Sequence, residues 1–142
     1  MTSGAPAFLL EENHDLPLCR FQVTLRGGAA QDLMGPSGLA AGAEPSGLCN
    51  FATELMRRGA GGRTRAEIDA AIDSLGASLG VSCGRESVCF EVMALKEKLD
   101  AAVAILADIV LRPDWPAEEA DKLRRELRAN LDDLRDDDGS LA

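Results

Sequence analysis

The sequence contains few aromatic residues and almost no histidine. Among its 142 residues there is no tyrosine, and there are one tryptophan (Trp115), four phenylalanines and one histidine (His14). Apolar residues nevertheless make up 46% of the chain, which excludes wholesale disorder and is enough to bury a core. We therefore expect a single domain whose core is built mostly from Leu, Val, Ile and Ala.

Positive charge is also scarce. Fifteen Lys and Arg residues face 24 Asp and Glu residues, and the formal net charge is −9. Because binding to nucleic acid or to an anionic membrane surface needs clustered basic residues, we expect neither of these partners. The excess of acidic residues does not by itself identify a partner.

Segments that would carry the chain into a membrane are missing as well. No apolar run approaches the roughly 20 residues of a membrane span, and residues 1–10 show no signal-peptide pattern. The four cysteines (Cys19, Cys49, Cys83 and Cys89) form no C-x-x-C pair and have apolar neighbours. We expect free thiols in a reducing compartment, and we predict a cytoplasmic protein with no membrane span.

Alternating apolar and polar residues predict two β-hairpins. Residues 19–25 alternate with a period of two, and together with residues 7–12 they predict a hairpin or two neighbouring strands around the polar turn at 11–15. Residues 79–83 and 87–95 predict a second hairpin.

Helical patterns follow each predicted hairpin. The first helix is expected over residues 48–58 with Ser46 as its N-cap, the second begins with a capping box at Thr64–Glu67, and the last is expected to be capped by Asp114. The apolar stripes of the last two helices are Leu99, Val103, Leu106 and Val110, and Leu123, Leu127, Leu131 and Leu134. The order of elements predicts an α+β fold, with helices packed on one face of a mainly antiparallel sheet.

A loop-like segment, residues 27–47, precedes the first helix. Within it, Pro36-Ser37-Gly38-Leu39-Ala40 recurs as Pro45-Ser46-Gly47-Leu48-Cys49. Because nothing else in the chain recurs, this is a local duplication and not a solenoid repeat. We expect residues 36–48 to be a loop insertion.

Three further motifs have ordinary structural interpretations. His14 is expected to be a solvated turn residue. The acidic run at 136–138 lacks the spaced ligands of a calcium loop and is interpreted as a solvated helix end. The glycine-rich run at 59–62 lacks the Gly-Lys-Ser/Thr of a phosphate-binding loop.

Taken in order, five segments resemble the N-terminal domain of insulinase-type (pitrilysin-family, inverzincin) zinc metallopeptidases. They are the strand, acidic turn and strand entry at 10–18, the strand end at 25–32, the helix at 47–59, the turn at 75–77 and the link between helices at 110–113. The resemblance covers nearly the whole chain. It implies a truncated metallopeptidase-like (LuxS/metallohydrolase-like) domain, with residues 1–142 forming a single, incomplete unit.

The resemblance also implies a zinc site whose ligands are replaced here. In the family an H-x-x-E-H helix supplies two histidine ligands and the general base, and a glutamate from a later helix completes the site. The histidine positions fall on Asn50 and Glu54, the base position on Thr53, and the third ligand position near Asn130. Because one carboxylate and two amides do not make a zinc site, we interpret these four residues as degenerate positions. We predict no catalytic residue, no metal ligand and no cofactor in this chain, whereas active family members hold zinc.

The resemblance further implies paired domains or subunits that enclose a peptide chamber, of which only one carries zinc. We therefore expect a non-catalytic homologue or subunit of an insulinase-type peptidase, which supports peptide binding or assembly with an active partner. The expected partners are a second copy or a zinc-bearing peptidase subunit, with the peptide substrate lying along a strand edge. Two alternatives stay open. One is an active zinc metalloendopeptidase whose metal ligands lie outside this chain, and the other is a fragment whose function depends on further sequence.

Overall fold

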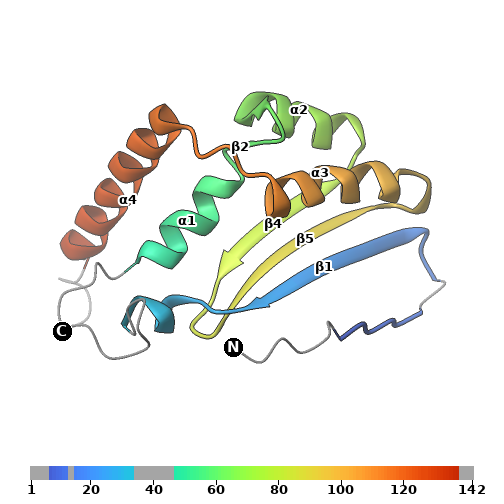
Figure 1. Ribbon diagram of the computed structural model, residues 1–142, viewed down its shortest axis with the longest axis horizontal. Helices are drawn as coiled ribbons and strands as arrows, with labels where there is room; N and C mark the ends of the chain where they lie inside the picture. The colour runs from blue at the N-terminus through green and yellow to red at the C-terminus, as the bar shows by residue number, and fades with distance from the viewer. Residues whose placement is uncertain (1–6, 13–14, 34–46, 138–142) are drawn as a thin grey trace.

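Helices cover one face of a small antiparallel sheet in the computed structural model, which describes residues 7–12, 15–33 and 47–137 (Figure 1). The main sheet consists of β1 (Leu18–Arg26), β4 (Ser78–Cys83) and β5 (Ser87–Leu95), and β2 (Gly59–Ala60) pairs with β3 (Arg63–Thr64) in a second, very short ladder. The helices are α1 (Leu48–Met56), α2 (Arg65–Ser74), α3 (Leu99–Leu111) and α4 (Ala117–Asp137), with short 3-10 helices η1 (Ala29–Leu33) and η2 (Lys96–Lys98). The expected α+β fold class is confirmed.

Strand β5 is the central strand of the main sheet. It pairs with β1 on one side and with β4 on the other, both antiparallel. Val92 of β5 lies opposite both Phe21 of β1 and Leu79 of β4, so apolar residues of all three strands point to the same face. The predicted hairpin of residues 79–83 and 87–95 is therefore confirmed.

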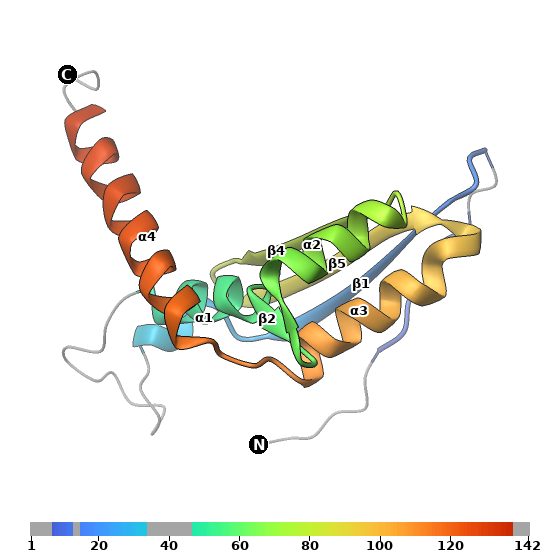
Figure 2. The same cartoon turned by 90° about the horizontal axis from the view of Figure 1, so that it is seen from above.

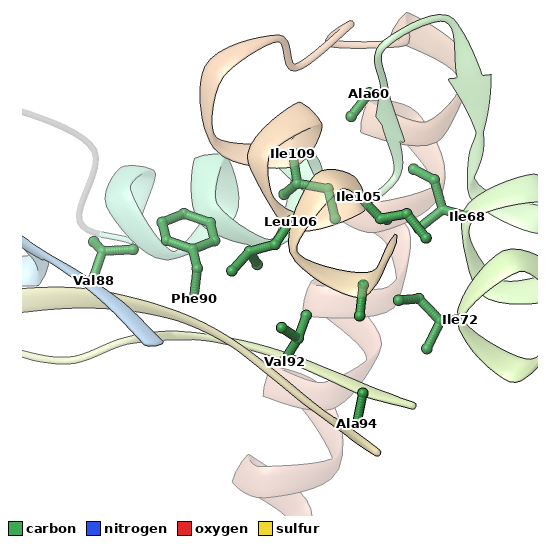
Figure 3. Close-up of a cluster of buried hydrophobic side chains, with 11 residues drawn as sticks. Ala60, Ile68, Ile72, Val88, Phe90, Val92, Ala94, Ile105, Leu106 and Ile109 are labelled. Carbon is green, nitrogen blue, oxygen red and sulfur yellow. The ribbon is translucent and has the colours of Figure 1, made fainter. Parts of the chain in front are cut away.

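The core lies between this face of the sheet and the helices α2 and α3. Every second residue of β5 is buried, and these side chains point toward buried residues of α2 and α3 (Figure 3). The buried residues are Val88, Phe90, Val92 and Ala94 of β5, Ile68 and Ile72 of α2, and Ala102, Ile105, Leu106 and Ile109 of α3. Because burying a large aliphatic or aromatic side chain contributes roughly 1.5–3 kcal/mol, this contact layer is the main source of stability.

Local signals in the sequence explain several element boundaries. The capping box that begins α2 is present as predicted: the Thr64 hydroxyl accepts a hydrogen bond from the backbone N–H of Glu67, and the Glu67 carboxylate accepts one from the backbone N–H of Thr64. Gly28, with φ 128°, lies against the β4–β5 turn, where an added Cβ would be 2.5 Å from the carbonyl oxygen of Gly84. Only glycine fits this approach, which joins the end of β1 to that turn.

One sequence-based expectation is wrong, and another is confirmed only in part. Residues 7–12 form no strand, and β1 pairs only with β5 among the described residues. The predicted stripe of α3 is confirmed in part, because Leu106 is buried and Val103 and Val110 pack half-buried against the core. The other fully buried positions of this helix are Ala102, Ile105 and Ile109. Because α3 is apolar on most sides, periodicity could not select the face that meets the sheet.

The beginning of the last helix also differs from expectation, whereas α1 begins at Leu48 as predicted. Helix α4 begins at Ala117, and Asp114 instead accepts a hydrogen bond from the backbone N–H of Gly62 at 2.8 Å. Ser46, the expected cap of α1, and residues 36–46 of the expected insertion lie outside the described residues, as does His14. The glycine-rich run at 59–62 forms β2 and the turn that leads to β3.

The far half of α4 extends beyond the helices that cover the sheet (Figure 2). Along the predicted stripe of this helix, Leu123 is buried, Leu127 is half-buried and Leu131 is 60% exposed. The opposite face of the sheet carries exposed Met93 and Leu95 beside polar residues of β1. No helix in the described ranges is long and apolar enough to cross a membrane.

We expect Ile109→Ala to lower the free energy of unfolding by about 2–5 kcal/mol, because it leaves a cavity between α3 and β5. Ile109 is fully buried, whereas Leu111 on the same helix is 76% exposed. The matched variant Leu111→Ala should therefore change the value by no more than about 0.5 kcal/mol. Urea unfolding monitored by circular dichroism measures both, and equal effects would contradict the described packing of α3.

Candidate functional site

The helix that resembles the family's zinc-binding helix is α1, and a distant carboxylate holds its first turn. Gly47, with φ 94°, provides no side-chain cap. Instead the two carboxylate oxygens of Asp32 accept hydrogen bonds from the backbone N–H groups of Gly47 at 2.8 Å and Cys49 at 3.0 Å. A negative charge at this end of the helix also complements the helix dipole.

Helix α1 holds three of the four predicted degenerate positions, and they have different environments. Asn50 and Glu54 are half-buried and lie one turn apart on the helix. Thr53 is only 3% exposed, and its hydroxyl donates a hydrogen bond to the carbonyl oxygen of Cys49 at 2.8 Å. Asn130 is exposed on α4. The hydroxyl of Thr53 is thus committed to the helix backbone at the position where the resemblance places a general base.

These residues do not suit a zinc ion. Zinc in proteins is held by histidine nitrogen, cysteine sulfur and carboxylate oxygen, and amide side chains are poor ligands. Of the four positions only Glu54 supplies a favoured donor. Within the described ranges there is also no group of three or more His, Cys, Asp and Glu side chains that could hold a metal ion.

Helix α1 packs against α4 (Figure 1), and the contact has an apolar part and an ionic part. In the apolar part, Leu55 of α1 packs with Ala120 and Leu123 of α4. Phe51, on the same side of α1, also receives the guanidinium of Arg124, which lies 5.5 Å from the ring centroid.

The ionic part is built around Arg58, which follows α1 and has a side chain only 8% exposed. Its guanidinium donates to both carboxylate oxygens of Glu126, at 3.2 and 2.5 Å, and lies 3.6 Å from a carboxylate oxygen of Glu119. Lys122 contacts Glu118 and Glu119 from the other side. The arrangement is a buried cation enclosed by the carboxylates of one helix.

The charges of this cluster stabilise one another. The hydrogen bonds from Arg58 lower the pKa of Glu126, and those from Lys122 lower the pKa of Glu119. Conversely, hydrogen bonding to Glu126 raises the pKa of Arg58, and hydrogen bonding to Glu119 raises the pKa of Lys122. All four groups are therefore ionised at neutral pH.

This ionic cluster was not predicted from the sequence. The signal that could have indicated it is the spacing of Glu119, Lys122 and Glu126, which places three charged residues on one face of α4. Their partner Arg58 lies 68 residues from Glu126 in the chain. Residues so far apart in the sequence give no local pattern that predicts their contact, so the contact could be identified only from the folded structure.

A single protein-family model matches nearly the whole chain. The sequence model described as insulinase (peptidase family M16) matches residues 9–140. Two curated relatives are a ubiquinol-cytochrome-c reductase complex core protein I of Euglena gracilis, 29% identical over 63% of this chain, and an uncharacterized zinc protease of Mycobacterium leprae, 30% identical over 68%. A third is the mitochondrial-processing peptidase subunit beta of Caenorhabditis elegans, 26% identical over 63% of this chain. The matched regions span 18%, 22% and 19% of these relatives, so the match accounts for about a fifth of their length.

Solved structures share the same fold. The peptidase M16 inactive domain from Pseudomonas fluorescens superposes with a TM-score of 0.77 and 20% identity, covering 92% of this chain and 30% of that one. Pitrilysin superposes with a TM-score of 0.67 and 17% identity, covering 85% of this chain and 12% of that one.

We expect Arg58→Ala to lower the free energy of unfolding by about 2 kcal/mol, since it removes the buried guanidinium that pairs with Glu126 and lies beside Glu119. The effect should be smaller than the roughly 3–5 kcal/mol of a fully buried pair, because the Glu126 side chain is 51% exposed. Urea unfolding at pH 7 measures it. Arg20→Ala, which removes an exposed ion pair with Glu91 on the sheet, serves as the control and should have a much smaller effect.

The difference in stability between the wild type and Arg58→Ala should also depend on pH. The pKa values of Glu119 and Glu126 are lowered in the folded state from their ordinary value of 4.5. Their stabilising contribution is therefore present above pH 4.5 and is lost as pH falls through the lowered values. Unfolding curves at several pH values between 3 and 7 should show a constant difference at higher pH that shrinks in acid. A difference that is independent of pH would contradict the proposed role of the two carboxylates.

Proposed function

The chain belongs to the insulinase family (peptidase family M16), and from this premise we propose that it is a non-catalytic member that supports peptide binding or assembly with a zinc-bearing partner. The observation that carries the proposal is Thr53. Its side chain is 3% exposed and its hydroxyl is bonded to the carbonyl oxygen of Cys49, where an active member would need a carboxylate that faces a metal-bound water.

The surroundings of α1 support the same proposal. Asn50 and Glu54 replace the two histidines implied by the resemblance, and Asn130 occupies the third position. On the side that faces α4, α1 makes apolar contacts, and Arg58 at its end forms ion pairs with α4. These contacts stabilise the helix pair and do not leave a set of open, metal-binding side chains.

The names of the relatives support a role in assembly. One is a core protein of a reductase complex and another is a subunit of a processing peptidase. A structural neighbour is an inactive domain of this family. We infer that this chain is one of the family members whose fold serves to bind other chains and not to catalyse a reaction. The zinc protease of Mycobacterium leprae represents the alternative, in which ligands outside this chain complete a metal site.

For peptide binding we place the peptide along the free edge of β4. This edge has no partner strand among the described residues, so its backbone groups are open to an added strand. A groove of about 410 Å³ lies beside it, lined by Ser78 and Leu79 of β4, Ile72 and Asp73 of α2, and Arg57. Its lining combines apolar residues, among them Ile72 and Leu79, with the charged Arg57 and Asp73, which suits side chains of an extended peptide.

We predict that the chain binds no zinc that survives dialysis and hydrolyses no peptide by itself. Elemental analysis after dialysis and a quenched fluorescent peptide assay with and without chelator measure both properties. Stoichiometric zinc with activity that chelation abolishes would favour the alternative of an active peptidase.

We also predict that Asn50→His, Thr53→Glu and Glu54→His together do not create activity. Glu at position 53 would place a carboxylate in a buried site that now holds a hydroxyl, which costs several kcal/mol, and Asn130 would still not serve as a ligand. The single variant Asn50→His, at a half-buried position, is the control for stability. Hydrolysis by the triple variant would show that the third ligand is placed wrongly at Asn130.

Finally, we predict that the chain associates with itself at rising concentration. The free strand edges, the open face with Met93 and Leu95, and the exposed end of the α4 stripe at Leu131 together present apolar and unpaired groups. Sedimentation velocity over a hundredfold range of concentration should show species larger than the 15.0 kDa chain. A monomer that melts cooperatively at every concentration would mean that the chain closes its own core.

A further inference from the structure

Two cysteines that are far apart in the sequence meet beside the first turn of α1. Cys49 lies in that turn, and Cys83 is the last residue of β4. Their sulfur atoms are 3.3 Å apart, which is closer than two non-bonded sulfurs usually approach. The other two cysteines take no part in this contact: Cys19 lies opposite Ala94, and Cys89 lies opposite Thr24, at different places along β5.

We propose that Cys49 and Cys83 are a reversible redox site, which closes to a disulfide that joins α1 to the end of β4. A disulfide needs the two sulfurs at about 2.05 Å, so the pair has to approach by a little more than 1 Å. Both residues are half-buried, and both pack at the border of the core. The pair is therefore held together by the fold without being sealed from small reagents.

The local hydrogen bonds permit this closure. The Cys83 thiol has the Cys49 sulfur and the carbonyl oxygen of Gly84, at 3.6 Å, as its acceptors. The backbone of Cys49 is fixed by two other bonds, its N–H to Asp32 and its carbonyl oxygen from Thr53. Neither of these two bonds involves the Cys49 thiol, so rotation of its side chain leaves them in place.

The oxidant can be a small disulfide such as oxidised glutathione. One protein thiolate attacks a glutathione sulfur, the glutathione disulfide breaks, and one glutathione leaves as thiolate. The second protein thiolate then attacks the resulting mixed disulfide, and the second glutathione leaves. Two protein thiols are oxidised and one glutathione disulfide is reduced to two thiols. Burial raises the pKa of the Cys83 thiol to about 11, so the reaction should become faster as pH rises.

The disulfide would join the first turn of the resembling helix, α1, to the end of β4. Residues 49 and 83 enclose β2, β3 and α2 in one covalent loop. Closing such a loop restricts the unfolded chain and stabilises the fold. Since α1 also carries the contacts to α4, oxidation would reduce local opening of the α1–α4 pair.

The test is to oxidise the folded 142-residue chain with glutathione disulfide at pH 8 and map the products. Trypsin separates the four cysteines, because cleavage at Lys and Arg leaves Cys19, Cys49, Cys83 and Cys89 in the peptides 1–20, 27–57, 66–85 and 86–96. We expect the thiol titre to fall by two, a single cross-linked pair of peptides 27–57 and 66–85, and a rise in Tm on the order of 5 °C that dithiothreitol reverses.

Two matched variants separate this pair from general thiol chemistry. Cys49→Ser should abolish the cross-link and the rise in Tm, while Cys19→Ser combined with Cys89→Ser should leave both unchanged. Oxidation of the wild type in concentrated urea should give mixed pairings, because the fold no longer brings the two sulfurs together. Glutathionylated monothiols, or cross-links that involve Cys19 or Cys89 in the folded chain, would overturn the proposal.

Discussion

The packing of α3 on β5 is the contact on which the rest of the structure depends. β5 supplies the buried side chains of the sheet, and it is also the only strand that pairs with both of the others. A slip of one residue in its register would turn Phe90 and Val92 outward and place Glu91 in the core. The positions of β1, β4 and the helices above them therefore follow from one strand and one helix.

A second, smaller set of contacts positions α1, and it adds polar contacts to the apolar packing of Leu55 and Phe51 on α4. Asp32 holds the beginning of the helix, the Thr53 hydroxyl bonds within it, and Arg58 joins its end to α4. Each of these contacts leaves a polar group of α1 paired in the folded state. In a helix with family chemistry the same region would have to keep such groups open toward a metal. The contrast is the physical basis for proposing a structural role, since paired groups stabilise a fold but do not react.

Apolar side chains are well buried in the core of the chain, but several others are exposed on its surface. One face of the sheet and the outer part of α4 expose apolar side chains, although the layer between the sheet and α3 is fully closed. The part of this chain that matches its curated relatives spans only about a fifth of their length. A domain of this family that is held by one well-packed layer can therefore offer its remaining faces to other chains or segments, which is how the proposed role in assembly would use the fold.

The sequence by itself determined the local elements of this protein. Alternation in residues 87–95 predicted a half-buried strand, Thr64 and Glu67 predicted a helix start, and the ordered segments of the family resemblance predicted the fold class. These signals succeed because strand alternation and helix capping depend on residues within a few positions of one another. The same spacing placed Asn50, Thr53 and Glu54 on one helix, but it could not say that Thr53 points inward while Asn50 and Glu54 are half-buried.

Only the tertiary structure decided the contacts between distant segments. It selected Ala102, Ile105 and Ile109 as the buried partners of Leu106, because several faces of α3 are apolar and only the sheet chooses among them. It also brought Asp32 to the start of α1, Arg58 to Glu126 and Cys49 to Cys83. The physical reason is that charge pairing, capping by a remote carboxylate and contact between sulfurs act over a few ångströms in space. Positions along the sequence do not reveal which distant residues come this close, because their distances are set only when the core packs.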